Sequence, residues 1–101
     1  MRMMLKVTMD TAVTNGAIQD GSMMKLIQKL HARIKPEACY YTTLCGQRTM
    51  LAFFECEESS SIMVEIAEPL FIGLKAKCEL VPVMNAADLQ RGFEAWKKSG
   101  V

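Results

Sequence analysis

The side chains of this chain best suited to proton transfer are one histidine, His31, and two tyrosines, Tyr40 and Tyr41. An imidazole titrates near neutral pH and a phenol can donate or accept a hydrogen bond, so a pair of them could move a proton on a small substrate. His31 follows Ile27 by four residues and precedes Ile34 by three, which places it beside the apolar stripe of a helix. The imidazole could face a cleft, or it could be a hydrogen-bonded histidine at the margin of the core.

The two tyrosines are adjacent in a strand-like segment, so their side chains point to opposite faces of a sheet. Only one of them can share a pocket with His31. A tyrosine there could stack against or hydrogen-bond a ligand; the alternative is packing with the hydroxyl in water.

Two charged residues are candidates for ligand binding. Arg48 flanks a predicted turn and could bind a carboxylate, although charges beside turns often serve only solvation. Glu68 could act as a base if it were buried, but its place directly before Pro69 also suits the end of a helix.

The four cysteines do not have the spacing of a metal or redox site. Cys39, Cys45, Cys56 and Cys78 form no CxxC pair, and the chain has a single histidine. Cysteines within apolar strand-like segments are usually small, reduced, buried side chains. We therefore expect free thiols, with a disulfide or a reactive thiol as the alternative, and no metal and no cofactor.

Charge and motifs exclude several classes of function. The net charge is only +1 and the basic residues are scattered, so we expect no nucleic-acid binding. No apolar run approaches the ~20 residues of a membrane helix, and no export signal is recognisable. A cytoplasmic location without membrane association is expected. Neither a nucleophile elbow nor a phosphate-binding glycine loop occurs.

Hydrophobic periodicity predicts the elements that must position these residues. Alternation predicts strands at 2–9, 37–45, 48–56 and 74–83. Helical spacing predicts a helix from about Ser22 to residue 35, after an irregular segment, with an earlier start near Thr14 as the alternative. A second helix is expected from residue 62 to Glu68, with Gly73 in a turn after it. Asn85 and Asp88 predict the N-terminus of a third helix.

The strands at 37–45 and 48–56 are predicted to form a hairpin around Gly46–Gln47, with Cys45 paired to Arg48. This register places Tyr41 opposite Ala52, Thr43 opposite Met50 and Cys39 opposite Phe54. Both faces of the hairpin are then substantially apolar, whereas a sheet with one wet face alternates cleanly. Half of the chain is apolar, so a partner is expected to cover the second face.

The order of these elements predicts an α+β fold for residues 1–101 as a single domain: a ferredoxin-like βαββαβ two-layer sandwich plus a C-terminal helix. The usual strand order of this fold is 4-1-3-2, which puts the last strand at an edge. Pro82 in that strand agrees, because proline cannot donate a ladder hydrogen bond.

Three segments carry a resemblance to a known family: Glu68–Leu74, Val81–Asn85 and Asp88–Leu89. There the chain resembles a family of small uncharacterised bacterial ferredoxin-like proteins related to the dimeric α+β barrel superfamily. The resemblance implies a homodimer in which two sheets pack face to face, and it implies no catalytic residues.

Two hypotheses of function follow. The first is a small homodimeric module that binds a ligand or partner without catalysis, because no acid, base and nucleophile are visibly assembled. The alternative is a cofactor-independent monooxygenase or isomerase acting on a small aromatic or hydrophobic substrate, with His31 and a tyrosine in proton transfer. The barrel superfamily contains both kinds of protein, so fold alone does not choose between them.

Overall fold

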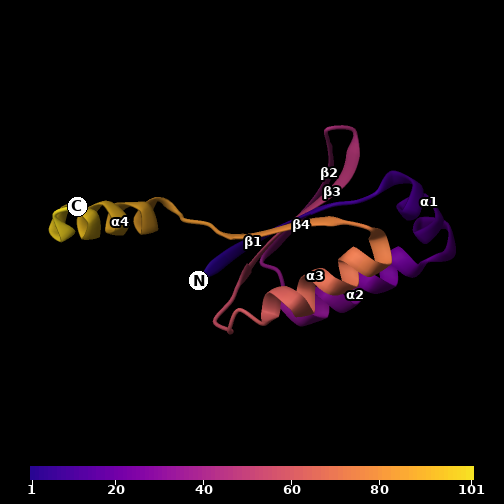
Figure 1. The fold of residues 1–101 in the computed structure, drawn as a ribbon, viewed down its shortest axis with the longest axis horizontal. Coiled ribbons are helices and arrows are strands. Elements are labelled where there is room, and N and C mark those ends of the chain that lie inside the picture. The colour runs from indigo at the N-terminus through magenta and orange to yellow at the C-terminus, as the bar shows by residue number, and fades with distance from the viewer.

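A computed structural model describes all 101 residues as four strands and four helices (Figure 1). In chain order these are β1 (Arg2–Thr8), α1 (Thr11–Asp20), α2 (Ser22–Ile34), β2 (Ala38–Leu44), β3 (Gln47–Glu55), α3 (Ile62–Leu74), β4 (Lys77–Pro82) and α4 (Ala86–Ser99). The predicted alternation of strands and helices is confirmed, with the first helical region divided into α1 and α2.

The four strands form one antiparallel sheet in the order β2-β3-β1-β4. Read from the β4 edge, this is the predicted order 4-1-3-2. Strand β4 lies at the edge and ends at Pro82. Proline has no N–H, but at an edge this position does not need to donate a hydrogen bond to a neighbouring strand. The fold is therefore α+β, with the strand order of a ferredoxin-like sandwich.

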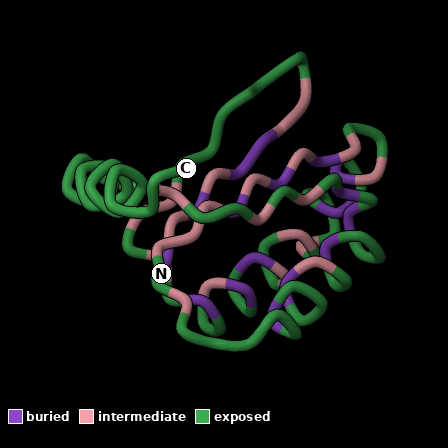
Figure 2. Tube along the Cα trace, turned by 60° about the vertical axis from the view of Figure 1, so that its left-hand side comes forward, coloured by how far each residue is buried: buried purple, intermediate pink, exposed green.

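The core lies between one face of the sheet and α1, α2 and α3. Leu5 and Val7 of β1 are fully buried, whereas their neighbours Met4 and Lys6 are only partly buried, as the pleat of a strand requires. Buried segments follow the strands and the inner sides of the helices (Figure 2). The largest buried side chains include Met50 and Phe54 of the sheet and Ile66, Leu70 and Leu74 of α3. We call the other side of the sheet, which no helix of the chain covers, the open face.

The segment after β1 is helical, so the prediction of an irregular entry before Ser22 was wrong. Asp10 caps α1 by accepting a 2.9 Å hydrogen bond from the Val13 N–H. Thr14, fully buried, donates to the Asp10 carbonyl at 2.8 Å. Gly21 then adopts φ 82°, a left-handed conformation that ends α1 and lets α2 begin at Ser22 as predicted.

The hairpin turn differs from the prediction by one residue. Its two central residues are Cys45 and Gly46, both with positive φ, which is the type I′ pattern. Leu44 therefore pairs with Gln47, instead of Cys45 with Arg48. The observed register sets Tyr41 opposite Met50, Cys39 opposite Ala52 and Thr43 opposite Arg48. Because the register has shifted by two residues, every side chain keeps its predicted face.

Helix α3 continues past the proline that was expected to end it. Pro69 lies on the exposed side, where the Glu65 carbonyl that loses its N–H partner can bind water. Leu70 and Leu74, each 1% exposed, bury enough apolar surface to offset that loss. Gly73 is thus helical rather than part of a turn, and a Cβ there would come within 3.1 Å of Leu26 on α2. Strand β4 starts at residue 77, three residues later than predicted.

Helix α4 extends away from the rest of the molecule (Figure 1). The radius of gyration is 16.1 Å, whereas about 13 Å is typical of a compact chain of this length. None of its residues is buried. The predicted capping is confirmed: the Asp88 N–H donates to the Asn85 side chain at 2.8 Å, and the Asn85 N–H donates to the Asp88 carboxylate at 3.1 Å.

Candidate functional site

Three reactive side chains meet near the connection between α2 and the edge strand β2. The Nε2 atom of His31 lies 3.5 Å from the Cys39 sulfur and 3.5 Å from the Tyr41 hydroxyl. His31 is in the last turn of α2, and Lys35 ends the helix in a left-handed conformation (φ 46°) that turns the chain back beside it. Cys39 and Tyr41 are two residues apart, so both project toward α2. We call these three residues the His31 cluster.

Tyr41 is 56% exposed, and its partial burial is the first cause of a raised pKa, followed by the hydrogen bond with Cys39 and the charge of its thiolate; together they raise that pKa to about 12. The phenol therefore stays protonated at neutral pH and can donate a hydrogen bond. It cannot serve as a base there, so the base of this cluster would be the His31 imidazole. Cys39, half buried, is the nearest nucleophile to that imidazole. The sequence did not single out Cys39, because all four cysteines were expected to be buried thiols, with a disulfide or a reactive thiol as the alternative.

The second tyrosine lies apart from this cluster. Tyr40 is on the open face and 62% exposed, opposite Leu51 of β3. Of the two tyrosines, Tyr41 is the one that meets His31, on the opposite side of the sheet from Tyr40.

The two candidate ligand-binding residues have different surroundings. The Arg48 guanidinium donates hydrogen bonds of 2.8 Å to the Thr14 hydroxyl and 2.9 Å to the Asn15 side chain, so it joins β3 to α1. Glu68 is exposed on α3. The hydrogen bonds of Arg48 go to α1, and none joins Arg48 to Glu68. The structure does not bring Arg48 and Glu68 together with the His31 cluster.

Three cavities lie elsewhere on the surface. One of about 140 Å³ separates α2 from α3, one of about 390 Å³ lies where α4 leaves the sheet, and one of about 320 Å³ lies at the turn end of the open face. None is lined by His31, Tyr40 or Tyr41. No group of three or more His, Cys, Asp or Glu side chains is placed to hold a metal ion.

The cavity between α2 and α3 is bordered by ion pairs that the sequence did not suggest. Arg33 contacts Glu58 with both terminal nitrogens, at 3.0 and 2.6 Å, and Glu65 at 3.0 Å. The hydrogen bond from Arg33 is the first cause that lowers the pKa of Glu58. All three groups are at least one-third exposed, so these pairs orient the two helices more than they stabilise them.

The open face of the sheet is not covered by any other part of the chain. Its apolar residues Met4, Leu51 and Phe53 are partly buried although no helix covers them, and Val81 is 40% exposed. Toward the turn end the face becomes polar, with Lys6 3.6 Å from Glu79 across the β1–β4 pair. A face of this kind can bury its apolar row only against another surface.

No helix of the structure is both long enough and apolar enough to span a membrane. Comparison of the chain with protein-family models, with curated proteins and with solved structures found no match. The open face and the His31 cluster are therefore the two features of the molecule that bear on function.

Proposed function

We propose that this protein is a small homodimeric binding module whose two copies associate through the open face of the sheet. The observation that carries the proposal is the apolar row of Met4, Phe53 and Val81 on three neighbouring strands, which no helix covers. The resemblance to the dimeric α+β barrel superfamily supports the same arrangement. A ligand or partner would then bind at or near the interface, with a small hydrophobic molecule as the simplest choice.

Light scattering coupled to size-exclusion chromatography tests this proposal. The wild type should elute with twice the mass of one chain at micromolar concentration. Phe53→Glu and Val81→Lys should each give a monomer, because a charge at the centre of an apolar interface must be desolvated without a partner. Ile72→Glu is the matched control, since Ile72 is 80% exposed on α3, away from the sheet, and this variant should remain a dimer. A monomeric wild type contradicts the proposal.

A second function is favoured by one observation, the contact of His31 with Tyr41. A cofactor-independent monooxygenase or isomerase needs a base beside a hydrogen-bond donor, and the imidazole and the protonated phenol supply these two groups 3.5 Å apart. None of the three cavities is lined by either residue, which counts against this second function. Oxygen consumption with a hydroquinone as substrate tests the oxygenase form. A rate above the background of the buffer that His31→Gln removes would support it, and a rate equal to background counts against it.

A further inference from the structure

Helix α4 carries an apolar stripe that no other helix or strand of its own chain covers, although the Trp96 indole donates a 2.6 Å hydrogen bond to the carbonyl of Val101. Leu89, Phe93 and Trp96 recur at steps of four and three, so their side chains share one side of the helix. They are 45%, 46% and 56% exposed. The remaining surface of α4 consists of polar residues and small ones such as Ala87 and Ala95, with Lys98 on the side opposite the stripe. Figure 2 shows α4 exposed along nearly its whole length, with only Asp88 of intermediate burial.

The sequence nonetheless specifies this helix. It has a capping box at Asn85 and Asp88, two lysines in its last turn and a left-handed Gly100 after it. An isolated helix of this length is only marginally stable in water, and most helices are held by packing of an apolar face. A helix with these end signals and an unburied stripe therefore has its packing partner elsewhere.

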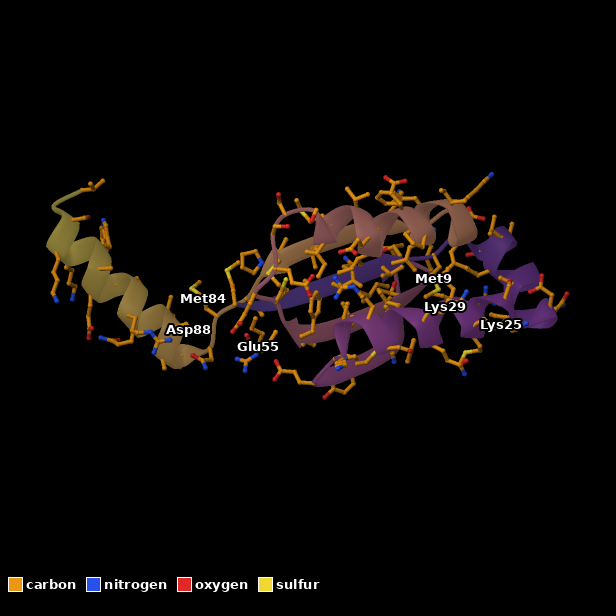
Figure 3. The ribbon with its side chains drawn as sticks, turned by 90° about the horizontal axis from the view of Figure 1, so that it is seen from below. Met9, Lys25, Lys29, Glu55, Met84 and Asp88 are labelled. Carbon is orange, nitrogen blue, oxygen red and sulfur yellow. The ribbon has the colours of Figure 1, made fainter.

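The connection to β4 directs α4 away from its own sheet. The Val83 N–H donates to the Arg2 carbonyl at 3.0 Å, which continues the β4 pairing one residue beyond Pro82. Asn85 is already the extended N-cap of the helix. Only Met84 remains free to redirect the chain, and it is 67% exposed at the junction between the sheet and α4, near Glu55 (Figure 3).

The apolar row of the open face lies beside this junction and matches the stripe in length. Met4 pairs with Phe53 on one side and with Val81 on the other, one residue from the end of the sheet where α4 leaves. The row crosses three strands, which spans about 10 Å. Leu89 to Trp96 also spans about 10 Å along the helix axis.

We propose that two copies of this chain exchange their α4 helices, each laying the Leu89, Phe93 and Trp96 stripe over the open face of the other copy. This inference rests on the proposed homodimer and specifies what covers the sheet. Two-fold symmetry makes the exchange reciprocal, so each copy contributes both a stripe and an apolar row. An aromatic side chain buries about 150–250 Å². Because the stripe residues are 45–56% exposed, only about half of such an area remains to be buried at each, so the stripe and the row form the apolar centre of an interface rather than the whole ~800 Å² per partner of a standard one.

Trp96 is the single tryptophan of the chain, so the fluorescence of the wild-type protein reports the environment of the stripe. On dilution from micromolar to nanomolar concentration, its emission should move to longer wavelength and its quenching by acrylamide should increase. Both changes should follow the same concentration dependence as the dimer fraction from light scattering. Phe93→Ala should raise the dimer dissociation constant about 30-fold, as expected of an interface anchor. Lys98→Ala, on the opposite side of α4, should leave it unchanged, with helix content checked by circular dichroism.

The alternative outcomes separate the two proposals. A dimer in which Trp96 emits as a water-exposed indole overturns the exchange and leaves the homodimer standing with its sheets face to face. Emission of a buried indole that does not change as the dimer dissociates places α4 on its own copy, which also overturns the exchange. A chain that is monomeric at every concentration refutes the homodimer itself.

Discussion

The guanidinium of Arg48 donates a 2.8 Å hydrogen bond to the hydroxyl of Thr14, which is fully buried in α1. Thr14 in turn donates to the carbonyl of Asp10, the residue that caps the helix. One side chain of β3 thus holds the N-terminus of α1 in place. The position of Arg48 beside a turn suggested ligand binding, but its guanidinium donates hydrogen bonds to α1 instead.

Removing this guanidinium should destabilise the fold. Arg48→Met should lower the free energy of unfolding by about 1–3 kcal/mol, because a hydrogen bond from a charged group to a buried hydroxyl is lost. Urea unfolding measures the difference. Arg91→Met on α4 is the control and should change stability by less than about 0.5 kcal/mol, since Arg91 is exposed and pairs only with Asp88. Unchanged stability of Arg48→Met would show that the guanidinium is free for a ligand.

The hairpin turn contains a residue that is poorly suited to its conformation. Cys45 has φ 52° and is followed by Gly46 at φ 74°. Asn-Gly is the preferred pair for such a turn, because asparagine tolerates the left-handed region. Cys45→Asn should therefore stabilise the protein by about 0.5–1 kcal/mol, whereas the β-branched Cys45→Val should destabilise it by about 1–2 kcal/mol. Thermal unfolding of the two variants should give midpoints on opposite sides of the wild type.

The element order and strand faces could be predicted because both depend on hydrophobic period, which is a local property. The register of the hairpin could not, since a turn at Gly46–Gln47 and one at Cys45–Gly46 keep the same faces. The end of α3 could not be predicted from local sequence either. Proline locally favours a helix end at Glu68, but the burial of Leu70 and Leu74 overrides that preference and the helix continues through Pro69.

The candidate site was predicted less completely than the fold. His31 was found because it is the single histidine, but its contacts depend on the angle at which Lys35 returns the chain to β2. The partners of Arg48 lie on α1, a segment that was predicted to be irregular because it contains Asn15–Gly16. A side chain can be assigned a partner only when the element that carries the partner has been predicted.

Two cysteines should differ strongly in reactivity. Burial raises the pKa of Cys78 to about 11, from an ordinary value of 9.0, whereas Cys45 is exposed in the turn. At neutral pH a shift of two units leaves about 100-fold less thiolate, and the thiolate is the nucleophile. Iodoacetamide should label Cys45 well before Cys78 in the folded protein, and peptide mass spectrometry identifies the order. Equal labelling of the two in the native state would contradict the burial of Cys78.

The same thiol should make stability depend on alkaline pH. The folded protein keeps Cys78 protonated up to about pH 11, whereas the unfolded chain loses this proton near its ordinary pKa of 9.0. The unfolded state therefore binds fewer protons between these values, and the free energy of unfolding must fall as pH rises through them. Comparison of urea unfolding at pH 8 and at about pH 10.5 measures the fall. Cys78→Ala should lose stability less steeply over this interval than the wild type does.

The raised pKa of Tyr41 provides a direct test of the His31 cluster. The chain has two tyrosines, so Tyr40→Phe leaves Tyr41 as the single phenol, and the ultraviolet absorbance of its phenolate can be titrated. That titration should be centred at about pH 12. Cys39→Ala in the same background should move it toward the ordinary value of 10.0 without reaching it, because this variant removes the hydrogen bond and the charge of Cys39 but leaves burial, the first cause. If Tyr41 titrates at its ordinary value, its hydroxyl is in water rather than beside Cys39, and the cluster cannot pair a phenol with the His31 imidazole.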